Sequence, residues 1–142
     1  MSPGSLNGSV SLTITRTSEL SYRRTLLLSL YITLLDDFIS LKEGLYPTVF
    51  GKDGPYTAPG AIVSSRVYHV HLLLTRQERC VSRRRFACTS NRALIYSRHA
   101  KFPNVYSLLA IFPDNAHQLA NDPRIMGEIA GYAAAFQALA HP

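Results

Sequence analysis

Two histidines separated by one residue are the side chains in this sequence best suited to proton-transfer chemistry. Between Val67 and Leu72, strand alternation puts His69 and His71 on one face of a sheet. An imidazole titrates near neutral pH, so the pair could act as base and acid. The alternative is that one or both are structural histidines on a half-covered sheet. The opposite face is apolar and suits a core, with Tyr68, Val70, Leu72 and Leu74.

Three consecutive arginines follow this strand, and a guanidinium binds two phosphate oxygens with its forked donors. In a strand Arg83 and Arg85 point one way and Arg84 the other. We predict Arg85, which opens a strand, as the catalytic cation, and Arg83 and Arg84 as RNA contacts. With the two histidines, the arginines would complete the base, acid and cation of metal-independent RNA cleavage. The alternative is a solvated basic turn.

Four other polar residues are candidates for the same site. Tyr96 alternates away from Ile95 and could place its hydroxyl at the rim, although a core tyrosine is the alternative. Lys52 could hold a phosphate, and Arg98 is a second candidate for the catalytic cation. His117 could sit near a helix N-terminus where phosphate is favoured, or simply on a helix surface.

Composition indicates one basic domain with a polyanionic partner. The 142 residues include 15 Lys and Arg against 9 Asp and Glu, a formal net charge of +6. Nucleic acid or an acidic protein fits this charge, and a merely basic surface is the alternative. Two cysteines without paired spacing favour a reduced, cytoplasmic protein. The apolar run from Thr25 to Leu35 is too short to span a bilayer, so no membrane partner is expected.

The pattern along the chain predicts an α+β domain. Residues 1–11 are predicted to be a disordered leader, with a single domain over 12–142. Ser11 to Thr15 suits a short strand. Helical periodicity then begins after a Ser18 or Ser21 cap and ends at Gly44, giving one long helix or a helix pair.

The middle of the chain predicts an antiparallel sheet of about four strands. Leu45 to Gly60 is rich in Pro and Gly and is predicted to be a loop, with Asp53 and Gly54 in a turn. Asn91-Arg92 suits a tight hairpin. A C-terminal helix follows a cap at Pro113-Asp114-Asn115. The predicted strands are Arg66 to Leu74, Arg85 to Thr89, Ala93 to Ser97 and Val105 to Phe112.

Five short pieces, in this order, resemble the YafO family, the toxins of bacterial type II toxin-antitoxin modules. The likeness runs from about Asp37 to Phe136. The pieces are Asp37 to Lys42, Phe50 to Asp53, His69 to Leu72, Thr89 to Asn91 with Leu94 to Tyr96, and Ala116 to Ala120.

The resemblance implies a ribosome-dependent mRNA endonuclease that inhibits translation, needs no cofactor and is neutralised by a YafN-like antitoxin. It also implies a small fold of the RelE class. The chain departs from the family pattern at Cys88, where an Arg is usual, and at Asn91, where an Asp is usual. If that Arg serves catalysis, this chain is weaker or uses Arg85 instead.

Two other classes of function are kept open. A zinc protein could use His69, His71 and one of Cys80, Cys88 or His117, although no carboxylate accompanies the pair and the cysteines lack paired spacing. The second alternative is a non-catalytic toxin of the gyrase-inhibitor type, which would bind nucleic acid or protein on the same fold, because fold alone does not fix function.

Overall fold

A five-stranded sheet in the order β1-β5-β4-β3-β2 forms the centre of this computed structural model, which describes residues 11–14, 26–80 and 87–142. The last four strands along the chain are antiparallel to their neighbours, and β1 runs parallel to β5. The strands are β1 (Ser11–Ile14), β2 (Phe50–Pro55), β3 (Val67–Leu72), β4 (Ala93–Arg98) and β5 (Val105–Phe112).

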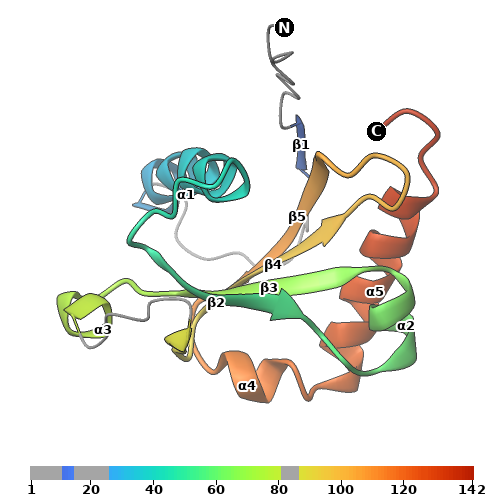
Figure 1. The fold of residues 1–142 in the computed structure, drawn as a ribbon. Helices are drawn as coiled ribbons and strands as arrows, with labels where there is room; N and C mark the ends of the chain where they lie inside the picture. Colours follow the sequence, from blue (N-terminus) through green and yellow to red (C-terminus); the bar gives the residue numbers. More distant parts are fainter. Residues whose placement is uncertain (1–10, 15–25, 81–86) are drawn as a thin grey trace, which may run out of the picture.

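Helices cover both faces of the sheet (Figure 1). One face carries α1 (Leu26–Lys42), and the other carries α2 (Gly60–Ser64), α4 (Ala116–Leu119) and α5 (Pro123–Gln137). The short α3 (Arg76–Cys80) follows β3 and lies beyond one end of the sheet. The predicted α+β class, with a helix before the sheet and a helix after it, is confirmed.

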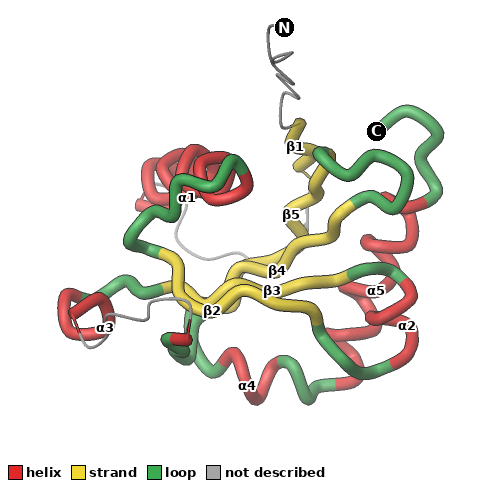
Figure 2. The backbone as a smooth tube through the Cα atoms, viewed as in Figure 1, coloured by secondary structure: helices red, strands yellow, loops and turns green. Residues whose placement is uncertain are grey.

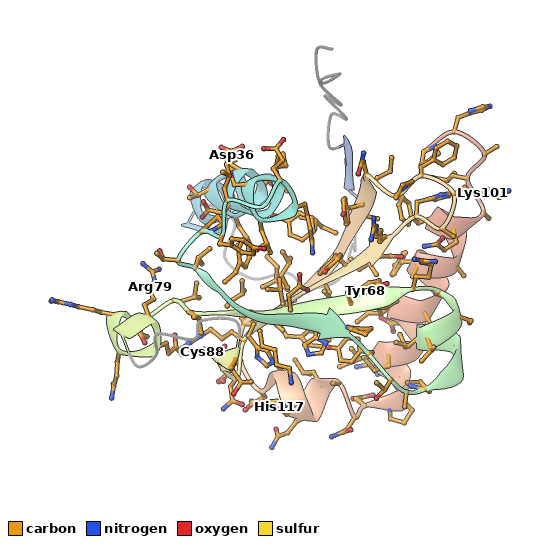
Figure 3. All side chains as sticks on the ribbon, in the orientation of Figure 1. Asp36, Tyr68, Arg79, Cys88, Lys101 and His117 are labelled. Atoms are coloured by element: carbon orange, nitrogen blue, oxygen red, sulfur yellow. The ribbon has the colours of Figure 1, made fainter. Side chains whose placement is uncertain are left out.

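The helix α1 ends where the sequence pattern predicted. Its described part is one continuous helix, with Leu34 and Phe38 buried against the sheet, while Asp36 points to the outer side (Figure 3). Gly44 follows with φ of 89°, a left-handed conformation that glycine adopts without a Cβ penalty. The predicted caps Ser18 and Ser21, and all of the predicted leader before Ser11, lie outside the described residues.

The C-terminal helix begins later than predicted. The carboxylate of Asp122 caps α5 by accepting from the backbone N–H groups of Arg124 at 2.9 Å and Ile125 at 3.2 Å. Pro123 supplies a first helical residue that has no N–H to satisfy. The predicted Pro113-Asp114-Asn115 segment precedes only the short α4.

Strand alternation divides the apolar side chains into two cores, one on each side of the sheet traced in Figure 2. On the α1 face, Leu34 and Phe38 pack on the buried strand residues Phe50, Val70, Leu72, Leu94 and Leu108. On the α5 face, the buried core comprises Ile62, Val67, Ala93, Ile95, Leu109, Phe112, Ala116, Met126, Ile129, Ala130 and Ala133.

The loop predicted for Leu45 to Gly60 was wrong, because this segment contains β2. Asp53 lies in that strand, paired with Val70, and not in a turn with Gly54. An edge strand tolerates such a sequence: its register is irregular between Phe50 and Asp53, and Pro55 stands at its last position.

The predicted hairpin at Asn91-Arg92 was also wrong. Residues 85 and 86 lie outside the described residues, and the rest of the predicted strand, residues 87–89, is not a strand. This segment crosses the end of β2 and β3 instead. The Cys88 carbonyl accepts from the Lys52 N–H at 2.7 Å, and the Ser90 hydroxyl donates to the Leu72 carbonyl at 2.7 Å.

Candidate active site

The sheet separates the predicted site residues into two groups. Tyr96 and Arg98 line a pocket on the α1 face. His69 and His71 lie side by side on the other face, as predicted. The ring of His71 contacts that of His117 from α4, which Figure 3 labels. The three predicted arginines Arg83, Arg84 and Arg85 lie outside the described residues.

The pocket has a volume of about 260 Å³ and lies where α1 ends over the sheet. It combines two cations, one carboxylate and three tyrosine rings, drawn from α1 and from four neighbouring strands. Its lining residues are Lys42, Asp53, Gly54, Pro55, Tyr68, Tyr96, Arg98 and Tyr106.

Lys42, Asp53 and Tyr96 form a closed hydrogen-bonded triad in this pocket. The Lys42 ammonium donates to Asp53 Oδ2 at 2.7 Å and to the Tyr96 hydroxyl at 2.6 Å. The Tyr96 hydroxyl in turn donates to Asp53 Oδ1 at 2.6 Å. An ammonium has three N–H donors, so Lys42 keeps one for a ligand. The triad therefore fixes its members in place and leaves a charged donor for a phosphate oxygen.

Burial and the contacts within the triad shift the pKa values of Lys42 and Tyr96. Burial lowers the pKa of Lys42, and the neighbouring Asp53 partly opposes that shift. Burial and the Asp53 charge raise the pKa of Tyr96, so its phenol stays protonated and serves as a donor. The pocket thus offers a carboxylate beside a cation whose proton is less tightly held than usual.

Arg98 supplies the second cation at the pocket. Its Nε donates to the Pro103 carbonyl at 2.7 Å, and its guanidinium lies 6.0 Å from the ring centroid of Tyr106, its cross-strand partner. In the described part of the chain, its two terminal nitrogens have no hydrogen-bond partner. Arg98 is therefore positioned by its Nε and can bind a phosphate with the rest of its fork.

The histidine cluster on the opposite face has a different environment. The ring centroids of His69 and His71 are 5.3 Å apart, those of His71 and His117 are 5.8 Å apart, and Tyr56 stacks on His69 at 4.4 Å. His71 Nδ1 lies 2.9 Å from the Ser90 carbonyl oxygen and 3.1 Å from the Ser90 nitrogen. Either tautomer of His71 therefore finds a partner.

His69 is the less well satisfied of the pair. Its Nδ1 is buried without a hydrogen-bond partner among the described residues. Burial lowers its pKa to about 4, helped by His71 and by the exposed Lys52 on β2. Burial also lowers the pKa of His71. Both shifts favour the neutral form of the ring. The catalytic roles of the two histidines stay predictions, as do the RNA contacts predicted for Lys52 and His117.

Neither a metal site nor a membrane segment emerges from the residues that the structure covers. Over 11–14, 26–80 and 87–142 there is no group of three His, Cys, Asp or Glu side chains arranged to hold a metal ion, so the zinc alternative gains no support. Within the same residues no helix has the length and apolar character needed to cross a bilayer.

Sequence reasoning missed two members of the triad, Lys42 and Asp53. Lys42 ends the helical pattern, and Asp53 lies in a segment whose composition suggested a loop. Both belong to the short pieces that carry the family resemblance, which was the one available signal. Lys42 is 11 positions away from Asp53 along the chain and 54 positions away from Tyr96, so only the fold brings the three residues together.

Comparisons with known proteins identify a family and one similar protein. The family described as "Toxin YafO, type II toxin-antitoxin system" matches residues 37–138. The mRNA interferase toxin YafO of Escherichia coli (strain K12) is 36% identical over 110 residues, covering 73% of this chain and 83% of that protein. No solved structure matches the chain significantly. The chain belongs to the YafO toxin family of type II toxin-antitoxin systems.

Proposed function

We propose that this toxin is an endoribonuclease that cuts mRNA in the triad pocket, without a metal or other cofactor. The single observation that carries the proposal is the Lys42–Asp53–Tyr96 triad facing Arg98 in one pocket. The similar E. coli protein bears the name mRNA interferase, which agrees with this chemistry.

Each charged residue of the pocket has its own role in RNA cleavage. The Asp53 carboxylate takes the proton of a ribose 2′-OH, whose oxygen attacks the adjacent phosphorus. Lys42 and Arg98 stabilise the negative charge on the phosphorane oxygens. The bond from phosphorus to the 5′-oxygen then breaks, and that oxygen takes a proton from water. The products are a 2′,3′-cyclic phosphate and a free 5′-hydroxyl.

Tyr96 holds the base and the cation in register. Its hydroxyl accepts from Lys42 and donates to Asp53, so it fixes the distance between a proton acceptor and a phosphate-binding charge. Its raised pKa keeps the hydroxyl protonated, as a donor to Asp53 must be. It is a positioning residue for the reaction.

The proposed setting is the translating ribosome in the cytoplasm. The net charge of +6 suits a partner coated with RNA phosphates. Membership of a toxin-antitoxin family implies an antitoxin, and we propose a YafN-like protein as the one that blocks the toxin.

Induction in bacteria without the antitoxin, followed by primer extension on a reporter mRNA, tests this function. We expect growth arrest with cuts inside translated regions, and neither effect for Lys42→Met. The matched control is Lys101→Met, because Lys101 is exposed in the loop between β4 and β5 (Figure 3) and should leave the cutting unchanged. Arrest with intact reporter mRNA would contradict nuclease action and favour a non-catalytic toxin.

A further inference from the structure

Three tyrosine rings from β3, β4 and β5 stand in a row along the pocket, with Tyr96 of the triad in the middle. Tyr68 and Tyr96 face each other across β3 and β4, with ring centroids 5.4 Å apart and ring planes 16° apart. Tyr106 lies on the far side of Tyr96 at 6.1 Å. Phe38 of α1 contacts Tyr96 and Tyr106 edge-on, at 4.9 and 5.7 Å. Phe38 and the Lys42 ammonium thus cover Tyr96 and Tyr106 from α1, and Tyr68 is the half-buried ring of the three.

Of the three tyrosines, Tyr68 is the one that a ligand can reach. The Tyr96 hydroxyl is used within the triad, and Tyr106 is buried, with 7% of its surface exposed. Tyr68 is the accessible member of the three, and its hydroxyl has no hydrogen-bond partner among the described residues. Tyr68 is half-buried although the sequence pattern placed it in the core with Val70. A core tyrosine would normally be covered and its hydroxyl satisfied. Tyr68 thus has an exposed polar edge that the fold itself does not use.

The two cations of the pocket lie close to this row of rings. Arg98 sits next to Tyr106, and Lys42 lies 4.3 Å from the ring centroid of Tyr96. An accessible aromatic ring next to phosphate-binding charges is the combination by which proteins hold single-stranded nucleic acid, because every base has a π-face. A base inside a duplex cannot reach such a ring without leaving the stack.

We propose that Tyr68, Tyr106 and Arg98 form a subsite that takes one unpaired nucleobase of single-stranded RNA, stacked on Tyr68, with its phosphate on Arg98. This inference rests on the proposed nuclease function and names its substrate class. Tyr68 is then a residue that selects which phosphodiester enters the triad, and Asp53 acts on the ribose attached there. The subsite explains why a half-buried tyrosine faces a charged pocket.

Binding of a short RNA measures the subsite directly. The probe is a single-stranded hexaribonucleotide that contains 2-aminopurine and carries 2′-O-methyl groups, which prevent cleavage. Stacking should quench its fluorescence, and the same strand in a duplex should bind at least about tenfold more weakly, the size of an ordinary stacking contribution. Tyr68→Leu should abolish quenching and weaken binding about tenfold, while Tyr68→Phe keeps both. Tyr132→Leu, on α5, is the matched control.

Cut-site profiles on translating ribosomes separate the two proposals. Tyr68→Leu should lower kcat/KM about tenfold and change the distribution of cut sites, whereas Tyr132→Leu changes neither. Wild-type cutting with an unchanged profile in Tyr68→Leu would overturn the subsite alone. Tyr68-dependent quenching without any cutting by the wild type would overturn the nuclease and keep the subsite. Absence of both quenching and cutting would overturn both.

Discussion

The two faces of the sheet hold polar side chains in opposite conditions. On the α1 face, Lys42, Asp53 and Tyr96 satisfy one another and still border a pocket. On the α4 and α5 face, His69 is half-buried, has no partner for Nδ1 among the described residues and has a lowered pKa. Burial disfavours charge on both faces, but Lys42 and Asp53 offset it by pairing with each other beside a pocket, whereas His69 has no such ion pair among the described residues. Chemically suitable residue types therefore indicate a site only where the fold leaves them both supported and accessible.

Asp53→Asn should give the largest effect and tests the α1 face. The amide can still accept from Tyr96, but it cannot take the 2′-OH proton, so cleavage should fall about 10³-fold. Single-turnover cutting on translating ribosomes measures the loss, with circular dichroism to establish folding. Asp114→Asn, on the exposed turn after β5, is the matched control. Cleavage within tenfold of the wild type would remove Asp53 from the chemistry.

The variants His69→Gln and His71→Gln test whether catalysis takes place on the histidine face or on the α1 face. If the rings transfer protons, as the sequence predicts, cleavage should fall about 10²-fold with thermal stability nearly unchanged. We expect the reverse, a stability loss with cleavage per folded molecule nearly unchanged, because the rings lie across the sheet from the triad and His71 holds the Ser90 backbone. Both variants need Tm and cleavage measured on the same preparation. A 10²-fold loss at full stability would return catalysis to the histidines.

Gly51→Ala should disturb the histidine face through the segment that supports it. A Cβ at this position would lie 2.4 Å from the Cys88 carbonyl oxygen and 3.2 Å from Leu73 Cδ2. The backbone near Ser90 must then move, so we expect a loss of about 2 kcal/mol in the free energy of unfolding. Gly54→Ala in the same strand is the control, since no described atom lies within 4 Å of its Cβ. Equal stabilities in urea titrations would contradict the close contact.

Local patterns could predict most of the strands but not the pocket. The period of β3, β4 and β5 and the apolar stripe of α5 are written in neighbouring residues, so those elements could be found. The edge strand β2 was missed because Gly51, Gly54 and Pro55 are ordinary loop residues whose strand is stabilised by pairing with β3. Tyr96 meets Lys42 only because α1 packs on that face of the sheet, and no local sequence pattern encodes where α1 packs.

The smallest expected effect is a fall in stability as the pH drops, caused by the histidine face. His69 has a folded pKa of about 4, below its ordinary 6.5, so the unfolded chain binds the proton more readily. Its contribution is fully present above pH 6.5 and is lost as the pH falls towards 4. His71 shifts in the same direction. Because His69 is partly exposed, we expect about 1 kcal/mol between pH 7 and pH 5, well below the full shift.

Urea titrations at these two pH values for the wild type and His69→Phe measure this contribution. Phenylalanine preserves a ring for Tyr56 to stack on and removes the titrating group, so the variant should lose most of the pH dependence. His141→Gln, at an exposed position near the end of the chain, should behave like the wild type. If the stability of His69→Phe depended on pH as strongly as that of the wild type, the acid sensitivity would come from another group, and the proposed difference between the two faces would lose this support. If the pH dependence of stability disappeared in His69→Phe, the burial of His69 would be its cause. This face would then disfavour an unpaired charge, in contrast to the pocket, where Lys42 and Asp53 form an ion pair.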